Sequence, residues 1–275
     1  MSTTAVTTRE TSVPTRRVAL EAAGPIRAIP LSRVVGVELR KMFDTRSGFW
    51  LMASIAITAT LATVAVIVFA PDSDITYTSF AGAVGFPMSV ILPVIAILAV
   101  TSEYSQRSGL TTFTLVPHRG RVITAKAIAV LTVAVFSMVL AMLIGVLGNI
   151  AGSAIAGVDT TWDSTATELL LIVLGNTLGM LVGFMLGVLI RNSAGAIVGY
   201  FVFSLVLPGL SELLAANASW YADRREWLDF NYAQGSLFGG SMTGEQWANL
   251  GVTSAVWLVL PLAIGLGTLM RSEVK

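Results

Sequence analysis

Residues able to do chemistry are scarce in this chain of 275 residues, and those that stand out lie in one polar, basic stretch at 102–126. The stretch holds the only histidine, His118, and separates two apolar runs that are each long enough to cross a bilayer. His118 has proline and arginine neighbours, so we interpret it as a solvated loop residue. Residues 110–116 form a short apolar helix candidate within the stretch. This pattern predicts a docking element rather than a catalytic centre.

Several kinds of chemistry are excluded by composition. The chain has no cysteine, which rules out disulfides, thiolate metal sites and cysteine nucleophiles. A single histidine outside the apolar runs leaves no buried Ser–His pair. No Walker A sequence is present, and the three lysines, Lys41, Lys126 and Lys275, have no glycine-rich approach. We therefore expect no catalytic residue, no cofactor, no metal and no nucleic acid partner, and any energy for transport must come from another polypeptide.

The elements that position these residues are membrane spans. The chain is 55% hydrophobic and only 12% charged, where soluble domains carry about 25% charged residues. About twenty apolar residues cross the hydrocarbon core as a helix. Six segments qualify, at 49–70, 80–101, 127–150, 169–190, 194–214 and 248–270. The predicted fold class is an all-α membrane protein with six transmembrane helices.

The distribution of charge predicts the orientation of the spans. With the N-terminal segment taken as cytoplasmic, 15 of the 17 basic residues and 6 of the 16 acidic residues fall on the cytoplasmic side. Only Arg224 and Arg225 are basic on the outer side. Lysine and arginine resist translocation, so both termini are expected in the cytoplasm of a multi-pass plasma-membrane protein.

The residues before the first span divide into two parts. Residues 1–30 are rich in Ser, Thr, Ala, Arg and Pro, which predicts a disordered cytoplasmic tail. The following helix is amphipathic, because one face collects apolar residues while Arg33, Glu38, Arg40 and Lys41 are expected largely elsewhere. This pattern predicts a helix lying in the membrane interface. Its apolar face is predicted from Leu31, Val35, Leu39, Met42 and Phe43.

The spans lack ionisable residues at their middle, which argues against a proton-coupled carrier. The fourth span instead carries Gly175, Gly179, Gly183 and Gly187 at four-residue spacing, a stripe that favours close helix packing. The stripe can pack within one subunit or against a second one. Four prolines predict kinks in the second, fifth and sixth spans: Pro87, Pro93, Pro208 and Pro261.

Helix-start signals mark the outer side. Thr165–Glu168 and Thr243–Gln246 predict capping boxes at the fourth and sixth spans, and Asp223–Glu226 resembles a third. Residues 215–247 are long, aromatic and polar, which predicts short interfacial or re-entrant helices forming an outer lid.

Together these features resemble the membrane subunit of a type-2 ABC exporter, a bacterial permease family, over residues 31–275. The resemblance is carried by the order of the spans and by Glu103-Tyr-Ser-Gln-Arg-Ser-Gly-Leu-Thr-Thr-Phe-Thr-Leu, followed by the basic run 117–121 and Lys126. It implies an N-terminal elbow helix at 31–46, a cytoplasmic coupling helix at 108–116 and outer helices at 215–240. It also implies separate cytoplasmic ABC ATPase subunits and a second permease subunit, in a homodimer or a heterodimer.

The implied mechanism assigns roles to six residues of the connector. Leu110, Phe113 and Leu115 would be apolar contacts of the coupling helix with the ATPase subunit. Glu103, Arg107 and Arg119 would be its polar contacts. The expected function is ATP-driven export of a lipophilic or amphipathic substrate.

Two other classes stay open. A membrane scaffold or assembly protein would use the connector to recruit a cytoplasmic partner. A secondary carrier is disfavoured by the uncharged spans.

Overall fold

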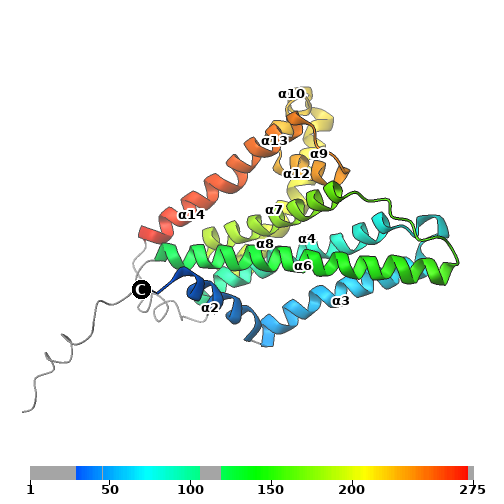
Figure 1. The fold of residues 1–275 in the computed structure, drawn as a ribbon. Helices are drawn as coiled ribbons and strands as arrows, with labels where there is room; N and C mark the ends of the chain where they lie inside the picture. The colour runs from blue at the N-terminus through cyan, green and yellow to red at the C-terminus, as the bar shows by residue number, and fades with distance from the viewer. Residues whose placement is uncertain (1–28, 45, 106–118, 272–275) are drawn as a thin grey trace, which may run out of the picture. The chain divides into compact units, whose positions relative to one another are not determined.

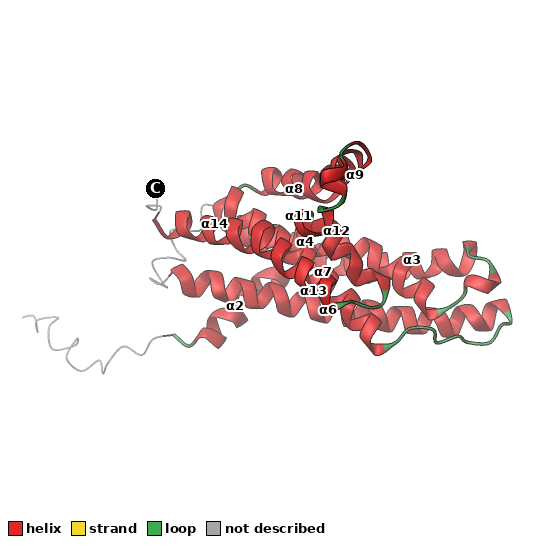
Figure 2. Cartoon of the chain, turned by 90° about the horizontal axis from the view of Figure 1, so that it is seen from above, coloured by secondary structure: helices red, strands yellow, loops and turns green. Residues whose placement is uncertain are grey.

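A computed structural model describes residues 29–44, 46–105 and 119–271, and the regular elements in these ranges are helices (Figures 1 and 2). Backbone contacts divide the chain between Pro30 and Leu31, and almost all described residues belong to the second unit. The six candidate spans run over Gly48–Phe69, Tyr77–Ser102, Gly120–Ala156, Ala166–Ile190, Ser193–Asn217 and Gly244–Arg271. The predicted all-helical class and the six spans, judged by length and composition, are thereby confirmed.

The elements follow one another along the chain without a sheet among the described residues; one isolated bridge joins Thr76 to Thr161. The longer helices are α2 (Leu31–Asp44), α3 (Arg46–Phe69), α4 (Tyr77–Ser105), α6 (Arg119–Ala156), α7 (Ala166–Ile190), α8 (Ser193–Phe201), α9 (Leu207–Asn217), α13 (Gly244–Ser254) and α14 (Leu260–Arg271). The short elements are η1 (Asp72–Asp74), η2 (Val202–Val206), α10 (Ser219–Ala222), α11 (Arg225–Leu228), α12 (Phe230–Gly235), η3 (Ser236–Gly239) and η4 (Ala255–Val259).

Helix α6 is longer than the third span predicted at 127–150. It has 38 residues, which at 1.5 Å per residue is about 57 Å, well beyond a hydrocarbon core of about 30 Å. Hydropathy marks only the part of a helix that suits lipid. The helix itself continues through the flanking polar and small residues because nothing in them breaks it.

The packing centre is the pair α4 and α7, and α4 also contacts α3, α6 and α8. Two α7 glycines let this helix approach the backbone of α4 closely. A Cβ on Gly183 would lie 2.5 Å from the carbonyl oxygen of Pro93, and one on Gly187 would lie 3.2 Å from Cβ of Val100. Only glycine allows two helix backbones to meet at such a distance.

The rest of the glycine stripe meets the short helices that precede the last span. A Cβ on Gly175 would lie 2.6 Å from the ring of Phe238, and one on Gly179 would lie 3.5 Å from Nε2 of Gln234. Gln234 also donates to the carbonyl of Gly175 at 2.7 Å.

Two π-helical turns, η2 and η4, interrupt the fifth and sixth spans. Each is followed, after one leucine, by a proline, Pro208 or Pro261. Proline has no N–H for the helical ladder, and a π-turn is one way for a helix to absorb the interruption. The irregularities predicted at these two prolines therefore take the form of π-turns.

The π-turn in the fifth span also fixes α12. The N–H of Leu207 bonds the carbonyl of Val202, so the following carbonyl, that of Phe203, would need the N–H that Pro208 lacks. Nδ2 of Asn231 in α12 donates to that carbonyl at 3.0 Å. The rings of Phe203 and Phe230 lie 5.9 Å apart and add an apolar contact.

Both complete capping boxes were predicted correctly. Thr165 caps α7 and Thr243 caps α13, and in each the Glu168 or Gln246 side chain returns a hydrogen bond to the capping residue. The box at Asp223 was wrong: α11 begins after Arg224 and has no side-chain cap. The carboxylate that caps a helix in this region is that of Asp229, which opens α12.

Candidate functional site

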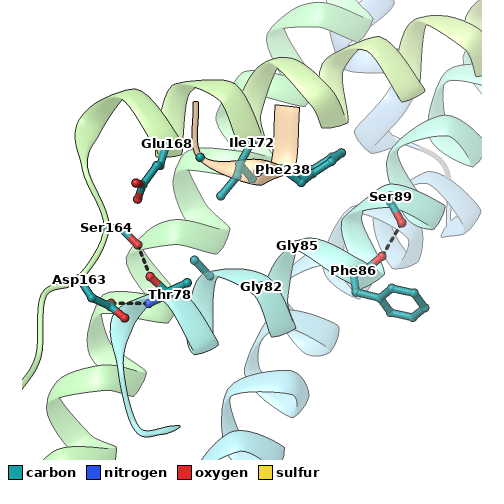
Figure 3. A pocket seen from close by; sticks show the side chains of 13 residues that line it. Thr78, Gly82, Gly85, Phe86, Ser89, Asp163, Ser164, Glu168, Ile172 and Phe238 are labelled. Carbon is teal, nitrogen blue, oxygen red and sulfur yellow. Dashed lines mark hydrogen bonds between the residues drawn. The ribbon is translucent and has the colours of Figure 1, made fainter. Parts of the chain in front are cut away.

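A cavity of about 650 Å³ lies beside the first half of α4, between it, the start of α7 and η3 (Figure 3). Its lining residues come from α4, from the loop before α7, from the first turns of α7 and from η3 with the glycine that follows it: Thr78, Ala81, Gly82, Gly85, Phe86, Ser89, Asp163, Ser164, Glu168, Ile172, Phe238, Gly239 and Gly240. The volume is in the range of small-molecule sites, about 300–1,000 Å³.

One end of the cavity is polar. Asp163 accepts a hydrogen bond from the backbone N–H of Thr78 at 2.9 Å, and the hydroxyls of Thr78 and Ser164 lie 2.7 Å apart. Glu168 turns toward the same end from the first turn of α7, as Figure 3 shows. Two carboxylates and two hydroxyls therefore converge where α4 and α7 begin.

The pKa of Asp163 is lowered. Burial alone would raise it, but the hydrogen bonds from the backbone N–H of Thr78 and from the hydroxyls of Thr76 and Thr78 favour the ionised form and outweigh that burial. Asp163 thus remains a carboxylate at neutral pH and caps α4 from a distant loop.

The remainder of the cavity is apolar and is kept open by glycines. A Cβ added to Gly82 or Gly85 would have nothing within 4 Å. Gly240 has a φ of 84°, and a Cβ there would lie 3.3 Å from Glu168, so glycine is required at this position. Ile172 and Phe238 lie on the opposite wall from the α4 glycines (Figure 3).

Beyond the cavity, the kink proline Pro93 is compensated by a side chain. Pro93 cannot donate to the carbonyl of Ser89, which is four residues earlier. The hydroxyl of Tyr200 in α8 donates to that carbonyl at 2.6 Å. This bond ties α8 to α4 at the point where the helical ladder of α4 is broken.

A second site lies at the other end of α4. Lys126 of α6 is buried and donates to Glu38 of α2 at 2.6 Å and to the carbonyl of Ala99 in α4 at 3.0 Å. Glu38 also pairs with Lys41 at 2.7 Å. We call Glu38, Lys126 and the Ala99 carbonyl the α2 clamp. It joins α2, α4 and α6 near the end of α4 and the start of α6, which are the two helix ends that the predicted connector links.

Sequence reasoning missed the role of Glu38. It was expected away from the apolar face of α2, yet it is buried, as is Val34 four residues earlier. The signal was present, because Glu38 is four residues from both Val34 and Met42 and so shares their side of the helix. A carboxylate on an apolar face required a buried cation, and Lys126 provides one.

Most of the predicted connector contacts lie outside the described residues. These are Arg107, Leu110, Phe113 and Leu115, together with the helix expected at 108–116. Glu103 belongs to the last turn of α4 and Arg119 is the first residue of α6. Residues 1–28 of the tail predicted at 1–30 also lie outside the described residues.

A third polar group ties α9 to α11 and α12. Ser211 donates to Asp229 at 2.5 Å and accepts from Nε of Arg225 at 3.0 Å, while the hydroxyl of Tyr221 lies 2.8 Å from Ser211. Burial opposes the charge of Arg225, but its hydrogen bond to Glu212 and the negative charges around it outweigh this and raise the pKa of the guanidinium. These partners satisfy one another, so we interpret the group as structural.

No protein-family model matches the chain, and a search of curated proteins gave no match. Its function must therefore be inferred from the chemistry of the cavity and of the α2 clamp.

Proposed function

We propose that this protein is the membrane subunit of an ATP-driven exporter, with a lipophilic or amphipathic substrate and a separate cytoplasmic ATPase. The connector between α4 and α6 binds the ATPase and α2 lies in the cytoplasmic interface. The short helices before α13 form the outer lid, and a second permease subunit completes the path.

The α2 clamp is the observation that carries this proposal. Lys126 is seven residues from the start of α6 and Ala99 is six residues from the end of α4, so both lie about 10 Å from the connector along their helices. Breaking a buried ion pair costs about 3–5 kcal/mol, so a force applied to the connector displaces α2, α4 and α6 together. A connector that transmits no force would not require α4 and α6, the helices on its two sides, to be bonded to a third helix.

The position of the cavity supports the same function. It borders the other half of α4, so a displacement of this helix changes the cavity walls. The described spans hold no acidic or basic side chain near their middle, which leaves no proton relay and favours a driving force from outside the chain. Switching between two discrete packings is the usual way in which such a displacement changes access to a site.

The experiment uses the chain reconstituted with the ATPase that copurifies from its native membrane. Phe113→Asp in the connector should leave membrane insertion unchanged and abolish stimulation of ATP hydrolysis by the permease. Phe69→Asp is the matched control, because Phe69 is 83% exposed at the end of α3 far along the chain from the connector. Full stimulation with Phe113→Asp, or copurification without any ATPase, would contradict the proposal.

A further inference from the structure

We infer that the cavity between α4, α7 and η3 is a binding site for a cationic amphiphile, with the cationic head group at Asp163 and Glu168 and the apolar part along Gly82 and Phe238. That such a ligand is also cargo rests on the proposed function. Binding itself needs only the geometry of the cavity.

Charge selects the sign of the ligand. Two lining residues are acidic and none is basic among those described. The flanking loops add Asp72, Asp74 and Asp159, again with no basic residue between 70 and 76 or between 157 and 168. A helix N-terminus carries roughly half a positive charge, so the starts of α4 and α7 offset only part of the carboxylates they bind. The polar end therefore attracts cations.

The distribution of polar and apolar groups selects an amphiphile. The two carboxylates and the hydroxyls of Thr78 and Ser164 lie at one end. The walls beyond them are mostly apolar and include Gly82, Gly85, Ile172 and Phe238. The hydroxyl of Ser89, at the far end, donates to the carbonyl of Phe86 at 2.7 Å. At the far end the ring of Phe86 is 76% exposed within a membrane span. A head group at one end and a chain or ring system along the walls would match this order of surfaces.

The geometry allows the charges to be removed without disturbing the fold. Glu168→Gln keeps the capping box, because Gln246 closes the equivalent box on Thr243 in this same chain. Asp163→Asn keeps an oxygen that can accept from the N–H of Thr78. Gly82→Leu and Gly85→Leu fill the cavity from a position where a side chain meets nothing within 4 Å.

The test measures binding to the full-length chain alone, in phosphatidylcholine nanodiscs, with empty nanodiscs subtracted. The probes are a dansyl-labelled dodecyl trimethylammonium and a dansyl-labelled dodecyl sulfonate of the same length. The wild type should bind the cation more tightly. The double variant Asp163→Asn, Glu168→Gln should weaken binding of the cationic probe about tenfold, which is the loss expected from two partly exposed ion pairs. It should leave binding of the anionic probe unchanged.

Filling the cavity should weaken the binding of both probes. Gly82→Leu should do so, and Gly85→Leu is the second variant if the first loses its cooperative thermal transition. Gly251→Leu is the matched control, since its Cβ also has nothing within 4 Å and it lies in α13 outside the cavity. Equal affinity for the two probes, unchanged selectivity in the double amide variant, or full binding by both filled variants would overturn the inference.

The same variants separate this inference from the proposed function. If the wild type binds the cation selectively but no ATPase is stimulated, the site stands and the transport role fails. If ATP hydrolysis depends on the connector but the wild type does not bind the cationic probe selectively, the site fails and the exporter role stands.

Discussion

The two halves of α4 are built differently. In its first half Gly82 and Gly85 face open space, and the helix start is capped by Asp163 from a loop about 85 residues away. In its second half the backbone of Pro93 touches Gly183, and the carbonyl of Ala99 receives a buried ammonium group. We call the half with the open glycine face beside the cavity the adaptable half, and the half with the close backbone contact near the connector the rigid half.

This difference suggests how α4 can transmit a displacement from the connector and change the shape of the cavity. Under the proposed function the rigid half would move as a unit with α2, α6 and α7, because it is fixed by backbone contact and by the α2 clamp. The adaptable half follows through Pro87 and Pro93, where the helical ladder is interrupted. A displacement that enters at the connector would therefore appear as a change in the cavity.

A glycine-to-leucine change at the α7 contact of the rigid half and the same change within the adaptable half should give the largest contrast. Gly183→Leu forces a side chain against the backbone of Pro93, which cannot move aside, and should lower the free energy of unfolding by more than about 3 kcal/mol. Gly82→Leu should change it by less than about 1 kcal/mol, because the added side chain enters open space and leucine favours a helix. Thermal unfolding in detergent measures both. Similar losses in the two variants would remove the distinction between the halves.

Removing one partner of the α2 clamp tests the rigid half on its own. Lys126→Met removes the buried ammonium partner of Glu38 and leaves the partly exposed Lys41 beside it, so it should cost about 3 kcal/mol, the lower end of the range for a broken buried ion pair. The double variant with Glu38→Met should recover most of this loss. Lys41→Met is the control, because its side chain is 44% exposed and its pair with Glu38 is worth at most about 1 kcal/mol. A Lys126→Met protein as stable as Lys41→Met would show that the α2 clamp does not contribute to the stability of the fold.

The junction between the halves should show a smaller effect. Tyr200→Phe removes the donor to the Ser89 carbonyl that Pro93 leaves unpaired, and should cost about 1–3 kcal/mol. Tyr232→Phe is the matched control, since its ring is 43% exposed and the ring face that meets Arg225 is kept. Unfolding in detergent reports both, and an equal effect of the two substitutions would be the contrary result.

The smallest effect is expected at the cap of the adaptable half. The pKa of Asp163 is lowered in the folded state, so its contribution to stability is present above the ordinary carboxyl pKa near 4 and is lost as the pH falls through its folded value. Between pH 7 and pH 3 the melting temperature of Asp163→Asn should therefore fall less than that of the wild type. A parallel fall in the two proteins would contradict the capping role.

The sequence predicted what depends on local pattern. Hydropathy located six spans, and the spacing of Thr165 with Glu168 and of Thr243 with Gln246 located two helix starts. It did not predict partners that are distant along the chain. Nothing local to Lys126 points to Glu38, which lies 88 residues earlier, and nothing local to Tyr200 points to Ser89. The cavity was also missed, because it depends on three separate segments and on the absence of side chains at Gly82 and Gly85.

The central claim is that the connector beside the α2 clamp faces the cytoplasm, where an ATPase can reach it. Because the chain has no cysteine, Thr112→Cys in the connector, which lies outside the described residues, and Ser73→Cys in η1 each introduce a single thiol. In intact cells a membrane-impermeant maleimide should label the thiol at position 73 and not the one at 112, and after permeabilisation it should label both. Labelling at position 112 in intact cells would contradict the account.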